Sequence, residues 1–160
     1  MIKREHLLEH VIRPTLAHMY GLNGGLVGKA AENLLLGTVL QESAGGKYLQ
    51  QLGGPALGIF QIEPATHEDV FDSFLKYRPD WENTIIKLAS RQFYLARNEE
   101  LVFNLRYACA IARVVYWRAP HPLPHEDNVR GLAEYWKLHF NTVAGAGTVE
   151  QFIGNYKMGQ

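Results

Sequence analysis

The sequence has a single cysteine and no excess of either charge. One cysteine, Cys109, excludes a disulfide framework within the chain, and its alanine and isoleucine neighbours favour a small buried thiol over a nucleophile. The 16 Lys and Arg residues equal the 16 Asp and Glu residues, which gives a formal net charge of zero. Because nucleic-acid-binding proteins usually carry a basic excess, we expect no nucleic-acid partner.

Long apolar segments are also missing. No stretch approaches the roughly 20 apolar residues of a membrane-spanning helix, so we expect no membrane span. The N-terminal sequence MIKREHLLEHVIRP carries charges every few residues, and we therefore expect no signal peptide. Apolar residues make up 47% of the chain and charged residues 20%, which is typical of a folded domain. The length fits one domain covering residues 1–160.

Patterns for cofactors and metals are absent as well. Neither a P-loop nor a dinucleotide fingerprint occurs. Histidines pair in sequence at His6 and His10 and at His121 and His125, but neither pair has a third ligand in a known pattern. We predict no cofactor and no metal.

Apolar residues recur at helical spacing through most of the chain, which predicts a mainly α fold. Pro14 is expected to break or restart the first helix. The residues from Tyr107 to Trp117 are apolar on nearly every side except at Arg113, which indicates a central, enclosed helix. Only Gly53 to Ile62 suggests β-structure, as a small hairpin. The predicted helices cover about residues 7–20, 27–43, 64–75, 80–99, 99–118, 128–140 and 149–157. Thr148 and Gln151 form a capping-box pattern at the start of the last one.

Glu42 ends the second predicted helix on its apolar side. Ala31, Leu35, Thr38 and Glu42 follow one another at spacings of four, three and four, which places the carboxyl group on the inward face. Burial and the negative end of the helix dipole would both raise the pKa of Glu42, as a general acid requires. The alternatives are that Glu42 reaches solvent from a frayed last turn or pairs with Arg106.

A glycine-rich loop, GGPALGIFQI, follows this helix. Gly58 leaves space for an extended ligand to approach the backbone. Gln61 supplies both a donor and an acceptor, which suits sugar hydroxyl and acetamide groups. The alternative is a plain β-turn with Gln61 exposed.

Together, Glu42-Ser43 and GIFQIEPAT (residues 58–66) resemble the soluble lytic transglycosylase family, which has a goose-type lysozyme-like fold. That family joins a helix ending in E-S to a glycine-rich turn and the pattern G-L-M-Q-I-x-P-x-T. Phe60 stands where the family usually has methionine. The resemblance covers about thirty of the 160 residues. It implies a lysozyme-like domain with a small β-hairpin.

The resemblance implies that Glu42 acts alone as acid and base on peptidoglycan glycan strands. It would protonate the glycosidic oxygen that follows N-acetylmuramic acid, and the C6 hydroxyl of that sugar would then close a 1,6-anhydro ring. The expected substrate-binding residues are Ser43, Gly58, Phe60, Gln61 and Ile62.

Two other functions stay open. A lysozyme-type hydrolase needs a second carboxylate, for which Glu63, Glu68 and Asp69 are available. No spacing singles one of them out, and we favour solvated residues in the first turn of a helix as the explanation of these acids. The third candidate is a catalytically idle module that binds glycans or belongs to a phage particle. The resemblance suggests a bacteriophage protein, located in the virion or in the host cytoplasm and delivered to the periplasm and cell wall, with other virion proteins as further partners.

The family's third signature, A-Y-N-A-G, has two partial matches. RYACA, residues 106–110, keeps a tyrosine, Tyr107, whereas HFNTVAG keeps Asn141 but has Phe140 in the tyrosine position. We favour Tyr107 as the second catalytic residue, because a hydroxyl on an enclosed helix needs a buried partner such as Glu42. The alternative is a core tyrosine bonded to a backbone carbonyl. The aromatic candidates for sugar stacking are Tyr48, Phe60, Tyr116 and Trp117.

Overall fold

The computed structural model describes residues 1–141 and 145–158 and is mainly helical, as the sequence predicted. None of the helices in these residues combines the length and apolarity needed to cross a membrane. The α-helices are α1 (Arg4–His6), α2 (Arg13–Met19), α3 (Lys29–Glu42), α4 (Pro64–Ser73), α5 (Pro79–Ile86), α6 (Glu100–Phe103), α7 (Leu105–Trp117), α8 (Val129–Trp136) and α9 (Val149–Met158). The π-helices are Leu7–Ile12 and Lys137–Asn141, and the short 3-10 helices are Gly24–Leu26, Leu75–Tyr77, Arg91–Tyr94 and Arg97–Glu99.

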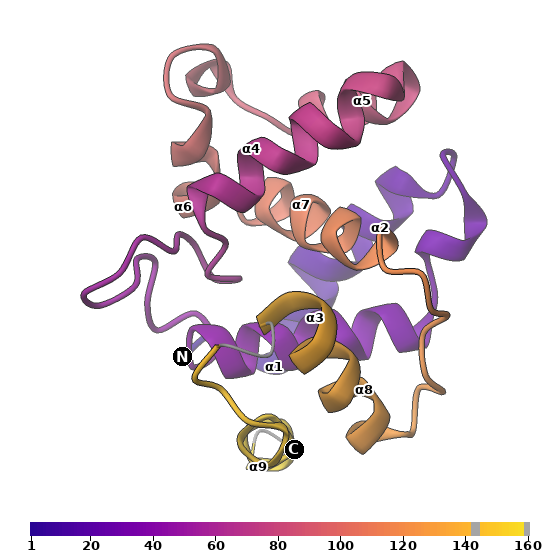
Figure 1. The fold of residues 1–160 in the computed structure, drawn as a ribbon, viewed down its shortest axis with the longest axis vertical. Helices are drawn as coiled ribbons and strands as arrows, with labels where there is room; N and C mark the ends of the chain where they lie inside the picture. Colours follow the sequence, from indigo (N-terminus) through magenta and orange to yellow (C-terminus); the bar gives the residue numbers. More distant parts are fainter. Residues whose placement is uncertain (142–144, 159–160) are drawn as a thin grey trace.

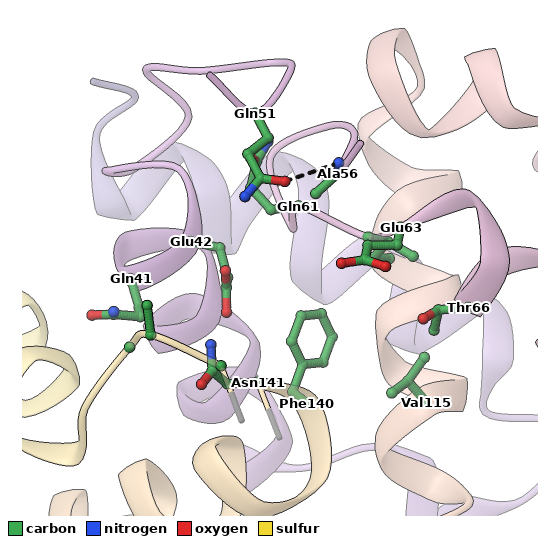
Figure 2. A pocket seen from close by; sticks show the side chains of 14 residues that line it. Gln41, Glu42, Gln51, Ala56, Gln61, Glu63, Thr66, Val115, Phe140 and Asn141 are labelled. Carbon is green, nitrogen blue, oxygen red and sulfur yellow. Dashed lines mark hydrogen bonds between the residues drawn. The ribbon is translucent and has the colours of Figure 1, made fainter. Parts of the chain in front are cut away.

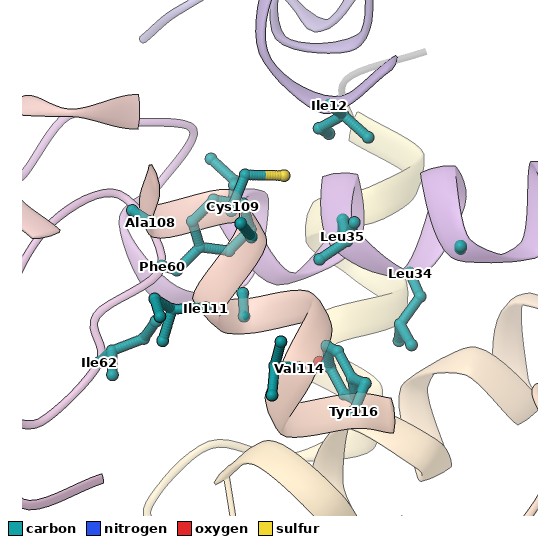
Figure 3. Packing of buried hydrophobic residues seen from close by; sticks show 14 of the residues in the cluster. Ile12, Leu34, Leu35, Phe60, Ile62, Ala108, Cys109, Ile111, Val114 and Tyr116 are labelled. Atoms are coloured by element: carbon teal, nitrogen blue, oxygen red, sulfur yellow. The ribbon is translucent and has the colours of Figure 1, made fainter. Parts of the chain in front are cut away.

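α7 lies in the middle of the molecule, with α4 and α5 on one side and α3, α8 and α9 on the other (Figure 1). Its side chains Cys109, Ile111 and Val114 are inaccessible to solvent and belong to a single apolar cluster (Figure 3). Burial raises the pKa of the Cys109 thiol to about 12, so the thiol stays protonated. The predictions of an enclosed helix and an inert cysteine are both confirmed.

Pro14 restarts the first helix rather than ending it. The π-helical stretch Leu7–Ile12 precedes it, and the backbone N–H of Arg13 donates to the carbonyl of Leu8. Proline cannot donate to the carbonyl four residues earlier, that of His10. Arg106 of α7 takes this place, because its Nε donates to His10 O at 3.0 Å. The side chain of a distant helix thus satisfies a carbonyl that the proline leaves without its usual partner.

The two helices predicted over about 80–99 and 99–118 are shorter in the structure. α5 ends at Ile86, and the chain then turns, because the backbone N–H of Ser90 donates to the Glu100 carboxylate at 2.9 Å. Asn104, with φ −101° and ψ 90°, separates α6 from α7. Its side-chain oxygen accepts the N–H of Tyr107 at 3.1 Å and so caps α7. Polar side chains that bond the backbone locally compete here with helix propagation.

The predicted hairpin over Gly53–Ile62 is reduced to isolated antiparallel bridges, which join Leu57 to Gln50 and to Ile62. Among the described residues these bridges do not extend into a strand. Gly58 has a φ of +74°, and a Cβ at this position would lie 1.8 Å from the carbonyl oxygen of Leu101. The loop is therefore shaped by close packing against α6 rather than by pairing of strands.

α9 closes the molecule beside α3 and α8 (Figure 1). Its start is the predicted capping box, in which Thr148 N donates to Gln151 Oε1 at 2.9 Å and Gln151 N donates to Thr148 Oγ1 at 3.2 Å. The ring of Phe152 fits over Gly37 of α3, where an added Cβ would lie 2.2 Å from the ring. This contact holds α9 close to the C-terminal half of α3, which ends at Glu42.

Candidate active site

A cavity of about 500 Å³ opens at the C-terminal end of α3. It is bounded by the loop between α3 and α4, by the start of α4, by α7 and by the segment that follows α8. The described residues that line it are Gln41, Glu42, Gln51, Ala56, Gln61, Ile62, Glu63, Thr66, Val115, Phe140, Asn141, Gly145, Ala146 and Gly147. Segments far apart in the sequence thus meet around Glu42 (Figure 2).

Glu42 is half-buried at the last position of α3 and points into this cavity (Figure 2). Burial raises the pKa of its carboxyl group from 4.5 to about 7, and a hydrogen bond from Trp136 partly opposes this shift. The predicted inward position is confirmed, and the frayed, solvated alternative is wrong. Pairing with Arg106 is also wrong, because that guanidinium binds the backbone of His10.

Trp136 is the hydrogen-bond donor to Glu42. Its indole Nε1 donates to Oε1 of Glu42 at 2.7 Å. The indole is fully buried at the end of α8, and its ring lies 5.4 Å from that of Phe152 in α9. Packing from two helices therefore fixes the direction of the N–H group. Trp136 was not predicted as a site residue, because its position on the apolar face of an amphipathic helix indicated only a core residue.

Gln61 lines the cavity from the loop that precedes α4. Its φ of +48° is left-handed, a conformation that costs a residue with a Cβ of order 1 kcal/mol. The side-chain Nε2 donates to the carbonyl of Gly58 at 2.8 Å, which leaves the amide oxygen as an acceptor. Opposite it in the loop, Gln51 Oε1 accepts the N–H of Ala56 at 3.2 Å (Figure 2). Gln61 lies in a turn, as the alternative expected, because its backbone N–H donates to Gly58 O at 3.0 Å, but its side chain is half-buried and lines the cavity.

Ser43, Gly58 and Phe60 lie beneath the cavity and do not line it. Ser43 Oγ donates to Ile59 O at 2.6 Å, which ties the end of α3 to the loop. Both backbone groups of Gly58 are used internally, since its N–H donates to Leu49 O at 2.7 Å and its carbonyl accepts from Gln61. These three residues therefore shape the loop, and the prediction that they contact a substrate is corrected.

Ile62 and Phe60 are both buried, but only Ile62 lines the cavity. Ile62 is 2% exposed and still reaches the cavity wall, as predicted. Phe60 is completely buried in the central apolar cluster, so it forms core rather than groove wall. The family's methionine position is thus a packing position in this chain.

Tyr107 does not meet Glu42. Its hydroxyl bonds Nε2 of His67 at 2.7 Å, and Nδ1 of His67 bonds Asn98 Oδ1 at 2.7 Å. Burial lowers the pKa of His67 to about 4, so the ring is neutral and links the two partners. Tyr107 is a core tyrosine, though bonded to a side chain rather than to a backbone carbonyl. Its predicted pairing with the acid is corrected.

The other partial match to the third signature does reach the cavity. Phe140 and Asn141 both line it, and the ring of Phe140 stacks on Tyr116 with centroids 5.1 Å apart. Asn141 Oδ1 accepts from Lys137 Nζ at 2.8 Å. Residues 142–144 of that match lie outside the described residues. The preference for Tyr107, which relied on its place in an enclosed helix, thus selected the segment that does not line the cavity.

Of the three acids considered as a second carboxylate, only Glu63 lines the cavity. In the view of Figure 2, the ring of Phe140 lies between Glu63 and Glu42. Asp69 instead faces outward and accepts from Arg118 Nη1 at 2.9 Å, which lowers the pKa of its carboxyl group after the larger effect of the Ser73 hydroxyl. Glu68 is exposed outside the cavity.

The other aromatic candidates and the histidine pairs lie elsewhere. Tyr116 is buried with its hydroxyl 2.7 Å from that of Thr38, and Trp117 lines a separate cavity. The rings of His6 and His10 are 5.7 Å apart, and residues 1–141 and 145–158 contain no group of three His, Cys, Asp or Glu side chains that could hold a metal ion.

Comparisons with protein-family models, with curated proteins and with solved structures found no match to this chain. The structure itself shows a mainly α fold. The finer description as lysozyme-like stays a prediction.

Proposed function

We propose that the chain is a peptidoglycan lytic transglycosylase with a lysozyme-like fold, in which Glu42 acts as the single general acid and base. The observation that carries this proposal is a carboxyl group with a pKa of about 7 inside a cavity of about 500 Å³. A group with this pKa holds its proton at neutral pH and can still release it during a reaction. The sequence motif around Glu42 points to the same chemistry.

In the first step Glu42 donates its proton to the glycosidic oxygen as the C–O bond breaks. The carboxylate that results accepts the N–H of Trp136, whose hydrogen bond favours the charged form. In the second step this carboxylate takes the proton of the C6 hydroxyl, whose oxygen attacks the anomeric carbon and closes the 1,6-anhydro ring. The proton returns to Glu42, so the cycle consumes no water.

The cavity wall suits an N-acetylated glycan. Amide groups of Gln51, Gln61 and Asn141 supply donors and acceptors for hydroxyl and acetamide groups. Phe140 adds apolar surface on which a sugar ring can pack. A wall of this kind binds a neutral polar ligand without electrostatic attraction, which agrees with the chain's formal net charge of zero.

A muramidase that uses water is the second candidate, and the position of Glu63 favours it. Glu42 and Glu63 are the two carboxylates that line the cavity among the described residues. A hydrolase uses one carboxyl group as acid and the other as base or nucleophile. Its products carry reducing ends and are heavier than anhydro products by one water molecule.

Digestion of purified sacculi followed by mass spectrometry separates these candidates. The proposal expects anhydro-muramyl fragments from the wild type, none from Glu42→Gln, and anhydro fragments in normal yield from Glu63→Gln. Glu68→Gln, an exposed change outside the cavity, is the matched control. Reducing ends that disappear with Glu63→Gln would establish the hydrolase. Binding of sacculi without fragments, unchanged by Glu42→Gln, would establish the catalytically idle module.

A further inference from the structure

A second cavity of about 500 Å³ lies beside the C-terminal end of α7. Arg113, Tyr116 and Trp117 face it, whereas Val115 faces the cavity of Glu42. Residues three and four positions apart share one side of a helix, so the two cavities are on different sides of α7. The described residues that line the second cavity are Gly25, Val27, Ala30, Arg113, Tyr116, Trp117, Ala119, Pro120, His121, Pro122, Leu123 and Tyr135.

Arg113 is the unusual member of this lining, because it is a cation with 2% exposure. Its Nε donates to Leu26 O at 2.8 Å and its Nη2 donates to Gly25 O at 3.2 Å. In the described part of the chain it forms no ion pair, and Nη1 makes no hydrogen bond. Burial lowers the pKa of the guanidinium to about 10, so the group is charged at neutral pH.

A buried charge without a counter-ion destabilises a fold, since backbone carbonyls replace only part of the lost hydration. Two carbonyl bonds could equally be made by a neutral side chain at lower cost. The remaining donor, Nη1, belongs to a residue that lines an open cavity, and no carboxylate lines that cavity among the described residues. No side-chain nitrogen or oxygen of the described residues is fully buried without a partner, so Nη1 keeps access to solvent. An anion in the cavity would supply an acceptor for Nη1 and the counter-charge that Arg113 lacks.

The other residues of the cavity wall indicate the kind of chemical group to which the negative charge is attached. Trp117, Leu123 and Tyr135 present aromatic and aliphatic surface, and the guanidinium carbon of Arg113 is 5.7 Å from the Trp117 ring centroid. Tyr135 uses its hydroxyl internally, donating to His121 O at 2.7 Å. One guanidinium in an apolar wall matches a single negative charge on an apolar body better than a multiply charged, fully hydrated ion.

We propose that this cavity binds an organic carboxylate with an apolar or aromatic body, held by Arg113 and packed on Trp117. Two sources share this chemistry: a free aromatic acid, and the C-terminal residue of a peptide. The site is separate from the cavity of Glu42, so binding there does not depend on the proposed cleavage of glycans.

Phenylacetate and its neutral counterpart phenylacetamide test the site, with binding followed by titration calorimetry and by the fluorescence of Trp117. We expect saturable binding of phenylacetate and at least about tenfold weaker binding of phenylacetamide, because the amide loses the charge-assisted bond. N-acetyl-alanyl-phenylalanine with a free or an amidated C-terminus is the second pair. If the peptide with a free C-terminus binds about tenfold more tightly than phenylacetate, the natural ligand is a peptide C-terminus. If phenylacetate binds more tightly than this peptide, the natural ligand is a free aromatic acid.

Single-residue variants test whether phenylacetate binds at Arg113 and Trp117. Arg113→Met is expected to weaken phenylacetate binding at least about tenfold, and Trp117→Phe to remove the fluorescence change. Arg118→Met, the neighbouring arginine outside this cavity, is the matched control with binding within about twofold of wild type. Glu42→Gln should bind phenylacetate normally, which separates this site from the proposed reaction.

Equal affinity for phenylacetate and phenylacetamide in the wild type would overturn the proposal even if Arg113→Met does not fold. The same holds if phenylacetate fails to saturate while inorganic phosphate binds. Normal binding by a folded Arg113→Met protein would also contradict it.

Discussion

Trp136 donates its indole N–H to the carboxyl group of Glu42 at 2.7 Å, across a sequence separation of 94 residues. This bond and the burial of the carboxyl group act on the pKa of Glu42 in opposite directions, and burial has the larger effect. The result is an acid whose pKa is about 7. Burial thus keeps the proposed catalyst protonated up to about pH 7, and the bond from Trp136 fixes the direction in which its carboxyl group points.

The first prediction concerns the pH dependence of cleavage. If Glu42 must enter the reaction protonated, kcat/KM for glycan release falls above pH about 7, because the free enzyme then loses the proton. The slope approaches one decade per pH unit. Initial rates on solubilised glycan strands between pH 5 and 9 give the profile. A rate that rises through pH 7 and stays high would contradict a protonated Glu42.

The second prediction is that Trp136→Phe shifts the alkaline decline of kcat/KM to higher pH. The substitution keeps an aromatic ring against Phe152 but removes the donor that favours the carboxylate. Loss of one charge-assisted bond is expected to raise the pKa of Glu42 by about one unit. Trp81→Phe, which lies outside the cavity, is the control for loss of an indole. An unchanged alkaline decline in a folded Trp136→Phe protein would show that the N–H does not act on Glu42.

The third prediction is that Glu42→Gln stabilises the protein at alkaline pH. Glutamine keeps an oxygen to accept the Trp136 N–H and cannot ionise. Below pH 4.5 the wild-type side chain is protonated in both states, so the variant and wild type should have similar free energies of unfolding. Between pH 4.5 and about 7 the unfolded state loses its proton first, which favours unfolding of the wild type.

Above pH 7 the variant should therefore be more stable by up to about 3 kcal/mol. Urea denaturation at pH 4.5, 6 and 8 measures the difference. Glu68→Gln is the control, with no comparable pH-dependent gain. A Glu42→Gln protein that loses stability as the pH rises would mean that the folded state favours the carboxylate.

The fold was predictable where it depends on local patterns. Helical periodicity placed Glu42 on the inner side of α3, and Thr148 with Gln151 marked the start of α9. The division between α6 and α7 was missed, because the competing bonds of Asn104 and Glu100 depend on the folded turn at Ser90. Periodicity reports which side of a helix is apolar, but not whether a capping side chain interrupts it.

Of the candidate site, the sequence predicted only the residues between Glu42 and Ile62. Glu42, Gln61 and Ile62 are close in sequence and line one cavity. Trp136 reaches Glu42 from α8, and Phe140 lines the cavity from the π-helix that follows. No local sequence pattern links either residue to α3. The sequence therefore indicated the acid, but not the groups that adjust its pKa.

The fourth prediction concerns Tyr107, which the sequence suggested as a catalytic residue. In the structure Tyr107→Phe removes the hydroxyl bonded to His67 and leaves a buried ring nitrogen without a partner. We expect a loss of about 1–3 kcal/mol in the free energy of unfolding, and cleavage activity close to wild type in the folded fraction. Tyr77→Phe, on an exposed tyrosine, should change neither. A Tyr107→Phe protein of normal stability without activity would restore the catalytic assignment.

The fifth prediction separates the two explanations for Gly58. Its φ of +74° and that of Gly53, +73°, are nearly equal, so alanine meets the same backbone strain at both positions, about 1 kcal/mol. Only at Gly58 would the added Cβ collide with a backbone atom, the carbonyl oxygen of Leu101, whereas nothing lies within 4 Å of it at Gly53. Gly58→Ala should therefore lower the free energy of unfolding by more than 3 kcal/mol, or about 2 kcal/mol beyond Gly53→Ala. Denaturation of both variants measures this difference. If Gly58→Ala instead unfolds like Gly53→Ala but fails to bind sacculi, the glycine serves the approach of a ligand, as the sequence motif first suggested.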